Sequence, residues 1–344
     1  MPLLKTNCFI FIILAAVTLI SHTRISQYEQ IDPDLLTAHW QFKTSESNRI
    51  NITENGLALL ANDAKTGVNT FQDLPLVNPG ATLLVSADVK CTNVVAGAKP
   101  WSLARIILAQ NDGEKDRWDL PHTVVALAGT TDWKHYRTAF TISPETKSIR
   151  LFAQLSQSTG SLQIKNLRSY PVHVNQAYIW ARAIILSAWS AFFLLLAGSC
   201  LFIRGKTILF RALLLTTFIA IIAGISLPGD LKNQVSDEVK VQIDAESESF
   251  KTVIPWDLSK VWHFCFFFLF GLILCLMMTK ESIIHAAAII LMLAGGTEMA
   301  QLYIDGRSPL ITDFFIDAAG GLLGITLIKL SSTNKNTVQS AYNQ

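Results

Sequence analysis

The sequence is short of charged residues. Only 16% of its 344 residues are Asp, Glu, Lys or Arg, whereas 50% are hydrophobic. Soluble proteins carry about a quarter charged residues, so this balance indicates a membrane protein. The formal net charge is +2, which gives no excess of positive charge to attract nucleic acid. We therefore expect membrane lipids, and no nucleic acid, among the partners.

Cysteine is also scarce. The five cysteines are Cys8, Cys91, Cys200, Cys265 and Cys275, and four of them fall in apolar runs. Cys91 alone lies in the polar part of the chain, so that part contains no internal disulfide. The spacing of the cysteines matches no zinc pattern. We expect neither a metal nor a cofactor.

The low average charge hides two different parts of the chain. Residues 24–174 read as an ordinary soluble domain, and residues 175–330 are mostly apolar. About 20 apolar residues cross the hydrocarbon core of a bilayer, and five stretches of the second part approach that length. They are residues 183–203, 207–227, 261–278, 283–304 and 314–330. Residues 175–330 are therefore predicted to form a transmembrane helical domain.

The N-terminal residues 1–23 contain a shorter apolar run, Cys8–Ile20, which Lys5 precedes. It is short for a full span and fits the core of a signal peptide as well. No convincing cleavage site follows the small residues Ala15 and Ala16. We interpret the run as an uncleaved transmembrane anchor, with a signal segment as the alternative.

Basic residues in the short connections set the expected orientation. Arg204, Lys206 and Arg211 crowd one connection, and Lys5 precedes the first helix. These segments and the tail at residues 331–344 are therefore expected in the cytoplasm. The chain then crosses a bacterial plasma membrane several times and holds its polar domain outside the cytoplasm.

Short alternating runs separated by turn residues fill the polar domain. Thr82–Lys90 follows a turn at residues 78–80, and Ser148–Leu155 and Ser161–Leu167 end the domain. Strands at this spacing, with no helical pattern between them, predict an antiparallel all-β sandwich. The fold class is thus a multi-domain membrane protein that combines a β-sandwich with a helical bundle.

The order of these features resembles the jelly-roll carbohydrate-binding modules. The likeness lies in Val77–Gly80 before a long strand, in Leu127–Tyr136, and in a final Gly160-x-Leu-x-Ile strand. The resemblance implies a jelly roll and a glycan ligand, although the same architecture also serves as a spacer or protein-docking module. Trp133 and Tyr136 are expected in the core, because an Asp-Trp turn fixes the strand that follows.

Sugar binding requires exposed aromatic faces beside hydrogen-bonding side chains. Trp101 and Trp118 fall in loop-like stretches, with Arg117 and His122 nearby. These four residues are the candidate glycan-binding site. Partial burial under a loop is an equally good interpretation of the two tryptophans.

Polar side chains also gather at the ends of the last three expected helices. The members are Lys260, His263, Glu298, Gln301, Arg307, Asp313 and Asp317. Spacings of three or four residues place them in pairs on shared helix faces. Asp317, Gly320 and Gly324 continue one stripe, and its glycines predict the close approach of a neighbouring helix. We interpret the seven residues as a membrane polar site in the outer leaflet; the alternative is a structural clasp of ion pairs.

These polar residues carry a second resemblance. The Lys-x-x-His-Phe motif from Lys260, the Glu-x-x-Gln helix end, the Arg turn and the Asp-x-x-x-Asp-x-x-Gly-x-x-x-Gly helix are similar to the VanZ-like family over about residues 255–330. The family is named for a protein linked to tolerance of the glycopeptide teicoplanin, so the resemblance implies such a link but no chemical activity. Asp317 stands where the family usually has asparagine, and its charge needs a partner such as Arg307 or Lys260.

Three hypotheses follow. The first is a membrane protein that binds or processes a cell-envelope glycan or glycoconjugate at the outer face. The second is an intramembrane enzyme acting on a lipid-linked substrate, with His263 or Glu298 as general acid or base and Arg307 and Lys260 holding a phosphate or carboxylate. No established catalytic motif supports the second. The third, a transporter or flippase, is disfavoured because the helices show no inverted repeat.

Overall fold

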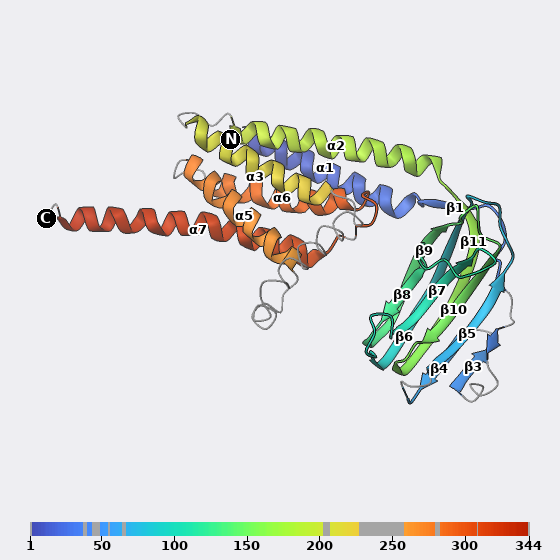
Figure 1. Cartoon of the computed structure of the whole chain (residues 1–344). Helices are drawn as coiled ribbons and strands as arrows, with labels where there is room; N and C mark the ends of the chain where they lie inside the picture. The colour runs from blue at the N-terminus through green and yellow to red at the C-terminus, as the bar shows by residue number, and fades with distance from the viewer. Residues whose placement is uncertain are drawn as a thin grey trace. The chain divides into compact units, whose positions relative to one another are not determined.

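A computed structural model describes residues 2–36, 40–42, 49–53, 56–63, 67–201, 207–226, 258–278, 283–307 and 309–342. The chain forms two compact units, which we call the β unit, Gln27–Asn175, and the helical unit, Met1–Ser26 with Gln176–Gln344. Figure 1 shows the strands of the first and the helices of the second. The predicted fold class, a β-sandwich with long apolar helices, is confirmed.

The β unit consists of two antiparallel sheets (Figure 1). The larger sheet contains β1 Tyr28–Gln30, β3 Ile50–Thr53, β4 Gly56–Ala61, β6 Thr82–Val95, β9 Gly129–Thr141 and β11 Thr159–Val174. Its order is β3-β4-β11-β6-β9, with β1 paired to β11. The smaller sheet contains β2 Gln41–Phe42, β5 Val68–Leu74, β7 Ala104–Asn111, β8 Thr123–Leu127 and β10 Ser148–Leu155. Its order is β2-β5-β10-β7-β8.

Alternation along the strands explains how the two sheets share a core. In β10, Ile149, Leu151, Ala153 and Leu155 are buried in that core, and every second residue between them faces away from it. Each of the fully buried isoleucine and leucine side chains stabilises the fold by about 1.5–3 kcal/mol. The outer face of each sheet is consequently left for solvent and ligands.

Trp133 does not lie in the core, contrary to expectation. It is 37% exposed on β9, where the Lys165 ammonium lies 4.5 Å from the centroid of its ring. Tyr136 packs partly buried against the core. The reason is that β9 already begins at Gly129, so both aromatic residues lie within one strand. Residues three apart in a strand point to opposite faces, and burying Tyr136 therefore exposes Trp133.

The helical unit contains six helices among the residues that the structure describes. They are α1 Pro2–Arg24, α2 Gln176–Leu201, α3 Ile208–Ser226, α5 Leu258–Met277, α6 Ile283–Gln301 and α7 Ile311–Tyr342. By length and composition, α1, α2, α5, α6 and α7 are able to cross a membrane. The apolar part of α3 is shorter, at Ile208–Gly224. Several ends differ from those predicted: α2 begins at Gln176 rather than at residue 183, and α6 ends at Gln301 rather than at residue 304.

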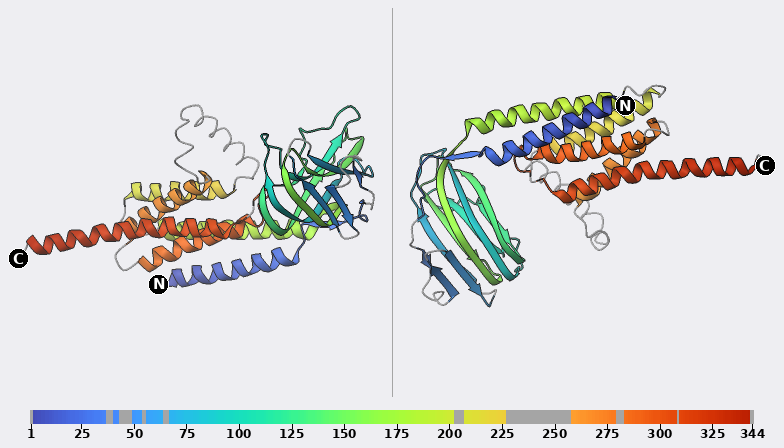
Figure 2. Two further views of the ribbon diagram at one scale, coloured as in Figure 1. Left: turned by 90° about the horizontal axis from the view of Figure 1, so that it is seen from below. Right: turned by 180° about the vertical axis from the view of Figure 1, so that it is seen from behind.

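Helix α1 is packed into the helical unit beside α2 and α6 (Figure 2). The ring of Phe11 meets that of the buried Trp189 edge to face, with centroids 5.9 Å apart. The Trp189 indole donates a hydrogen bond of 3.0 Å to the Thr18 hydroxyl. About one turn further along α1, the Ser21 hydroxyl accepts one of 2.8 Å from the Tyr303 hydroxyl. These contacts hold the middle and the C-terminal part of α1 in the helical unit.

Helices α5 and α7 pack backbone to backbone, as the glycine stripe predicts. A β-carbon added at Gly320 would lie 2.6 Å from the backbone oxygen of Phe264, and one added at Gly324 would meet the backbone of Phe268. Only glycine leaves room for such an approach. The contact brings the first turns of both helices together, and these turns carry the polar residues.

Candidate functional site

The outer face of the smaller sheet carries a cavity of about 660 Å³, which is within the range of small-ligand sites. Its floor is built by outward-facing residues of three neighbouring strands. Asn69 of β5 lies opposite Gln154 of β10, which lies opposite Arg105 of β7. Two residues further along the strands, on the same face, Phe152 lies opposite Ile107. The floor therefore offers a polar row beside an apolar one.

Aromatic side chains from the connecting loops form the walls of the cavity. Trp101 precedes β7 and is 51% exposed, and Trp118 lies between β7 and β8 and is 52% exposed. The ring of His122 meets that of Trp118 edge to face at 5.3 Å, and its Nδ1 lies 2.8 Å from the Leu120 carbonyl oxygen. The structure thus brings Trp101, Trp118 and His122 together around one cavity.

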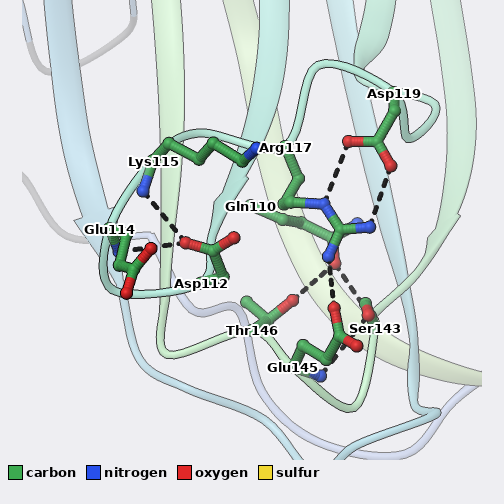
Figure 3. Close-up of polar contacts among 9 residues, drawn as sticks. All are labelled: Gln110, Asp112, Glu114, Lys115, Arg117, Asp119, Ser143, Glu145 and Thr146. Atoms are coloured by element: carbon green, nitrogen blue, oxygen red, sulfur yellow. Dashed lines mark hydrogen bonds and ion pairs between the residues drawn. The ribbon is translucent and has the colours of Figure 1, made fainter.

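Arg117, the fourth candidate from the sequence, does not line the cavity. Its guanidinium pairs with Asp119 at 2.8 Å and with Glu145 (Figure 3). These two carboxylates raise the pKa of Arg117, and the arginine lowers the pKa of Asp119 to about 2. Arg117 therefore joins the connection that carries Trp118 to the turn before β10.

Further hydrogen bonds order the same end of the sandwich (Figure 3). The buried Gln110 amide oxygen accepts hydrogen bonds of 2.8 Å from the Thr146 hydroxyl and from the Ser143 backbone N–H. The Asp112 carboxylate accepts two backbone N–H groups of its own turn at 2.9 Å, which lowers its pKa. The loop that presents Trp118 is consequently held at both ends.

Arg105 is the buried charged residue of this cavity, and the sequence did not single it out. Its side chain lines the cavity although only 8% of the residue is exposed. Its two Nη atoms lie 3.5 Å from the Trp101 carbonyl oxygen and 3.5 Å from the Thr123 hydroxyl. A signal was present, because Arg105 is the charged residue in the otherwise apolar run Leu103–Ala109.

In the helical unit, the polar residues of α5 and α7 meet at one end of the bundle. The His263 ring lies 3.2 Å from the Asp317 carboxylate, and Asp317 is fully buried. The partner of Asp317 is therefore His263, and the expected pairing with Arg307 or Lys260 is wrong. Lys260 precedes His263 by one helical turn, and Asp313 precedes Asp317 by one turn.

Glu298 lies near the end of α6 and is 5% exposed. Its Oε2 accepts a hydrogen bond of 2.9 Å from the Leu310 N–H, just before α7 begins. Its Oε1 is buried and has no hydrogen-bond partner among the residues described. Such an orphaned buried oxygen is unusual and calls for an explanation. Gln301, one turn later, is buried as well.

Arg307 lies in the connection between α6 and α7. Its Nη2 donates a hydrogen bond of 2.6 Å to the Gly224 carbonyl oxygen of α3. Burial lowers the pKa of Arg307, and the negative charge of nearby Glu298 opposes that shift. Within the described part of the chain, no three His, Cys, Asp or Glu side chains are placed to hold a metal ion.

Comparison with known families identifies the helical end of the chain. Residues 212–332 match the VanZ/LLP1 family. The resemblance predicted from the motifs is confirmed, and we call this stretch the VanZ-like region. It includes α5, α6, α7 as far as residue 332, and all seven residues of the polar cluster.

The solved structures to which this chain is similar include several carbohydrate-binding modules. They include "Family 16 Carbohydrate Binding Module-2", with 18% identity over 33% of this chain and 74% of the other and a TM-score of 0.24. The CBM22-1 xylan-binding domain from Paenibacillus barcinonensis Xyn10C has 14% identity, 43% and 94% coverage and a TM-score of 0.30. Similarity at this level does not indicate a ligand for this chain. No curated protein matches the chain by sequence.

Proposed function

We propose that this protein is a membrane-anchored receptor for a cell-envelope glycan, bound in the cavity of the β unit at the outer face of a bacterial plasma membrane. The observation that carries the proposal is the pair of half-exposed tryptophans, Trp101 and Trp118, on the walls of a cavity of about 660 Å³. Half-exposed indole faces at a concave site are the platforms on which sugar rings stack.

The floor of the cavity supports the same ligand class. The amide side chains of Asn69 and Gln154 offer both donors and acceptors, which matches the hydroxyl groups of a sugar. Phe152 and Ile107 add an apolar strip beside them, which matches the C–H faces of the ring. A spacer domain needs neither feature.

The membrane half of the chain supports a location of the β unit outside the cytoplasm. Positive charge at Arg204, Lys206 and Arg211 favours a cytoplasmic location for that connection, which leaves the β unit outside. Because the chain contains a VanZ-like region, the proposal includes a role in tolerance of glycopeptide antibiotics. It assigns no chemical reaction to that role.

The test of this proposal is binding of bacterial envelope polysaccharides to the full-length protein in lipid nanodiscs, measured by calorimetry. Trp101→Ala and Trp118→Ala are each expected to weaken binding about tenfold or more, because each removes one stacking face. Trp133→Ala is the matched control, since Trp133 is exposed on the other sheet. Absence of binding to every polysaccharide, or equal losses in all three variants, contradicts the proposal.

A second candidate function is catalysis on a lipid-linked substrate by the VanZ-like region. It is favoured by the buried Glu298 Oε1, which has no hydrogen-bond partner among the residues described, and by the His263–Asp317 pair at 3.2 Å. A carboxylate beside the ring orients the imidazole for general acid or base catalysis.

Mass spectrometry of a polyprenyl-phosphate-linked saccharide incubated with the reconstituted protein tests this second function. The expected result is a product that forms with the wild type and not with His263→Ala or Glu298→Gln. Folding of both variants is checked by thermal melting. A product formed equally by folded His263→Ala and Glu298→Gln contradicts the assignment.

A further inference from the structure

The cavity of the β unit contains a buried cation whose position is fixed. Arg105 lies on β7, an inner strand of the smaller sheet, which pairs with β10 on one side and with β8 on the other. Its neighbours across the strands are Gln154 and Ala126. Because the backbone is held on both sides, the side chain has little freedom to leave the cavity floor.

The guanidinium of Arg105 is poorly satisfied within the protein. Its contacts to the Trp101 carbonyl and the Thr123 hydroxyl are both 3.5 Å, longer than an ordinary N–H···O hydrogen bond. Among the residues described, no carboxylate lies within 4.0 Å of it. Arginine keeps its charge at any ordinary pH, so this is a buried and uncompensated positive charge.

Two other arginines of the β unit form ion pairs with carboxylates, as arginines in folded proteins usually do. Arg117 and Arg150 each lie 2.8 Å from an aspartate, Asp119 and Asp73 respectively. Both are more exposed than Arg105, so the most buried of these three arginines is the one that has no counter-charge. A buried charge is costly unless it is paired. Burial alone accordingly lowers the pKa of Arg105, with no contribution from a carboxylate to offset it.

Asp116 is the acidic residue that lines the same cavity. Its carboxylate accepts a hydrogen bond of 2.8 Å from the Asn111 amide and forms no ion pair with Arg105. It is therefore engaged with its own loop and leaves the guanidinium available to a ligand.

We infer that the glycan bound in this cavity is acidic, and that its carboxylate or phosphate pairs with Arg105 while its rings stack on Trp101 and Trp118. This inference rests on the proposed function of the cavity. The planar fork of a guanidinium matches two oxygens of either anion. Gln154, in the same row as Arg105, adds an amide donor for the same group. Arg105 is thereby the residue that selects acidic over neutral glycans.

The experiment uses the full-length protein in phosphatidylcholine nanodiscs, which have no net charge to compete. The probes are oligogalacturonate, its methyl ester of equal length, and poly(glycerol phosphate). The ester removes the charge and keeps the sugar backbone, and the third probe separates a phosphate from a carboxylate. We expect one of the two acidic probes to bind, and to bind at least about tenfold tighter than the neutral ester.

Variants assign the preference to Arg105. Arg105→Gln is expected to remove the difference between acid and ester, and Arg105→Lys, which keeps the charge but not the planar fork, to retain part of it. Arg150→Gln is the matched control, because Arg150 faces outward on the same sheet and already pairs with Asp73. Melting curves establish that the variants are folded, and the acid–ester comparison on the wild type needs no variant.

The outcomes separate this inference from the proposed function. Binding of neither acidic probe more tightly than the ester, or an acid preference that Arg105→Gln leaves unchanged, overturns the inference while glycan binding stands. Binding of neutral envelope polysaccharides but of no acidic probe overturns it as well. Failure of every polysaccharide to bind overturns the proposed function, and the inference with it.

Discussion

Two arginines twelve positions apart serve different purposes in the β unit. Arg117 is held by Asp119 and Glu145 at the end of the sandwich, whereas Arg105 faces the cavity with no carboxylate beside it among the described residues. The sequence suggested Arg117 because it adjoins Trp118 in an evident loop. Arg105 lies within a strand rather than in an evident loop, so the sequence did not single it out as a binding residue. Only the register of β5, β10 and β7 shows that Arg105 and Gln154 lie on the same face of the sheet.

A pH prediction follows from the Arg117–Asp119 pair. The pKa of Asp119 is lowered from 3.8 to about 2, so the stabilisation is complete above about pH 4 and is lost as the pH falls towards 2. The melting temperature of the wild type should therefore exceed that of Asp119→Asn above pH 4, and the two should converge near pH 2. Thermal unfolding followed by tryptophan fluorescence measures this difference. A gap that is constant between pH 2 and 6 contradicts the assignment.

The outward position of Trp133 shows that the sequence motif did not indicate where strand β9 begins. The motif suggested a turn at Asp132, but the strand already begins at Gly129, and the two-residue period then decides which aromatic side chain is buried. Trp101, Trp118 and His122 line one cavity although Trp101 precedes β7 and the other two follow it. Their convergence on one cavity depends on sheet pairing, which has no local signal.

At the scale of elements, the α5–α7 contact is the best-defined helix packing in the VanZ-like region. Gly320→Leu is expected to destabilise the helical unit by at least about 2 kcal/mol, because the new side chain meets the Phe264 backbone. The same change also separates His263 from Asp317. Thermal melting of the protein in nanodiscs measures the loss.

Gly198→Leu is the matched control for this prediction. Gly198 lies in the apolar helix α2, and a β-carbon there has nothing within 4 Å. This variant should therefore melt close to the wild type. Equal effects of the two substitutions would show that added side-chain bulk, rather than the α5–α7 contact, determines the stability.

The helices themselves were predictable from their apolar runs, and the stripe of Gly320 and Gly324 indicated one tight contact. Helix ends were less predictable. α2 begins at Gln176 rather than at residue 183 because its first turns are polar enough to resemble a linker. The partner of Asp317 was not predictable, since spacing along one helix does not say which residue of another helix faces it.

At the scale of the whole molecule, the sequence was sufficient to separate a β unit from a helical unit, because composition changes sharply between them. The order of strands was not predictable. β11 pairs with β1, β4 and β6, which are far from it in the chain. The alternation of apolar and polar residues within one strand does not indicate such long-range partners.

The proposed orientation gives a prediction for the intact cell. In a Cys265→Ser background, which removes the exposed native thiol, a cysteine placed by Asp132→Cys in the β unit should react with a membrane-impermeant maleimide. One placed by Lys206→Cys in the basic connection should react only after the membrane is permeabilised. The opposite labelling pattern would place the β unit in the cytoplasm and remove its access to envelope glycans.

The central claim, that the cavity of the β unit is the glycan site, is tested most directly by fluorine NMR of the full-length protein labelled with 5-fluorotryptophan. Single Trp→Phe variants assign the resonances of the eight tryptophans. Addition of a glycan that binds should shift the signals of Trp101 and Trp118 and leave that of Trp133 unchanged. Saturable binding that leaves Trp101 and Trp118 unchanged, or that shifts Trp133 alone, would place the glycan elsewhere and contradict the account.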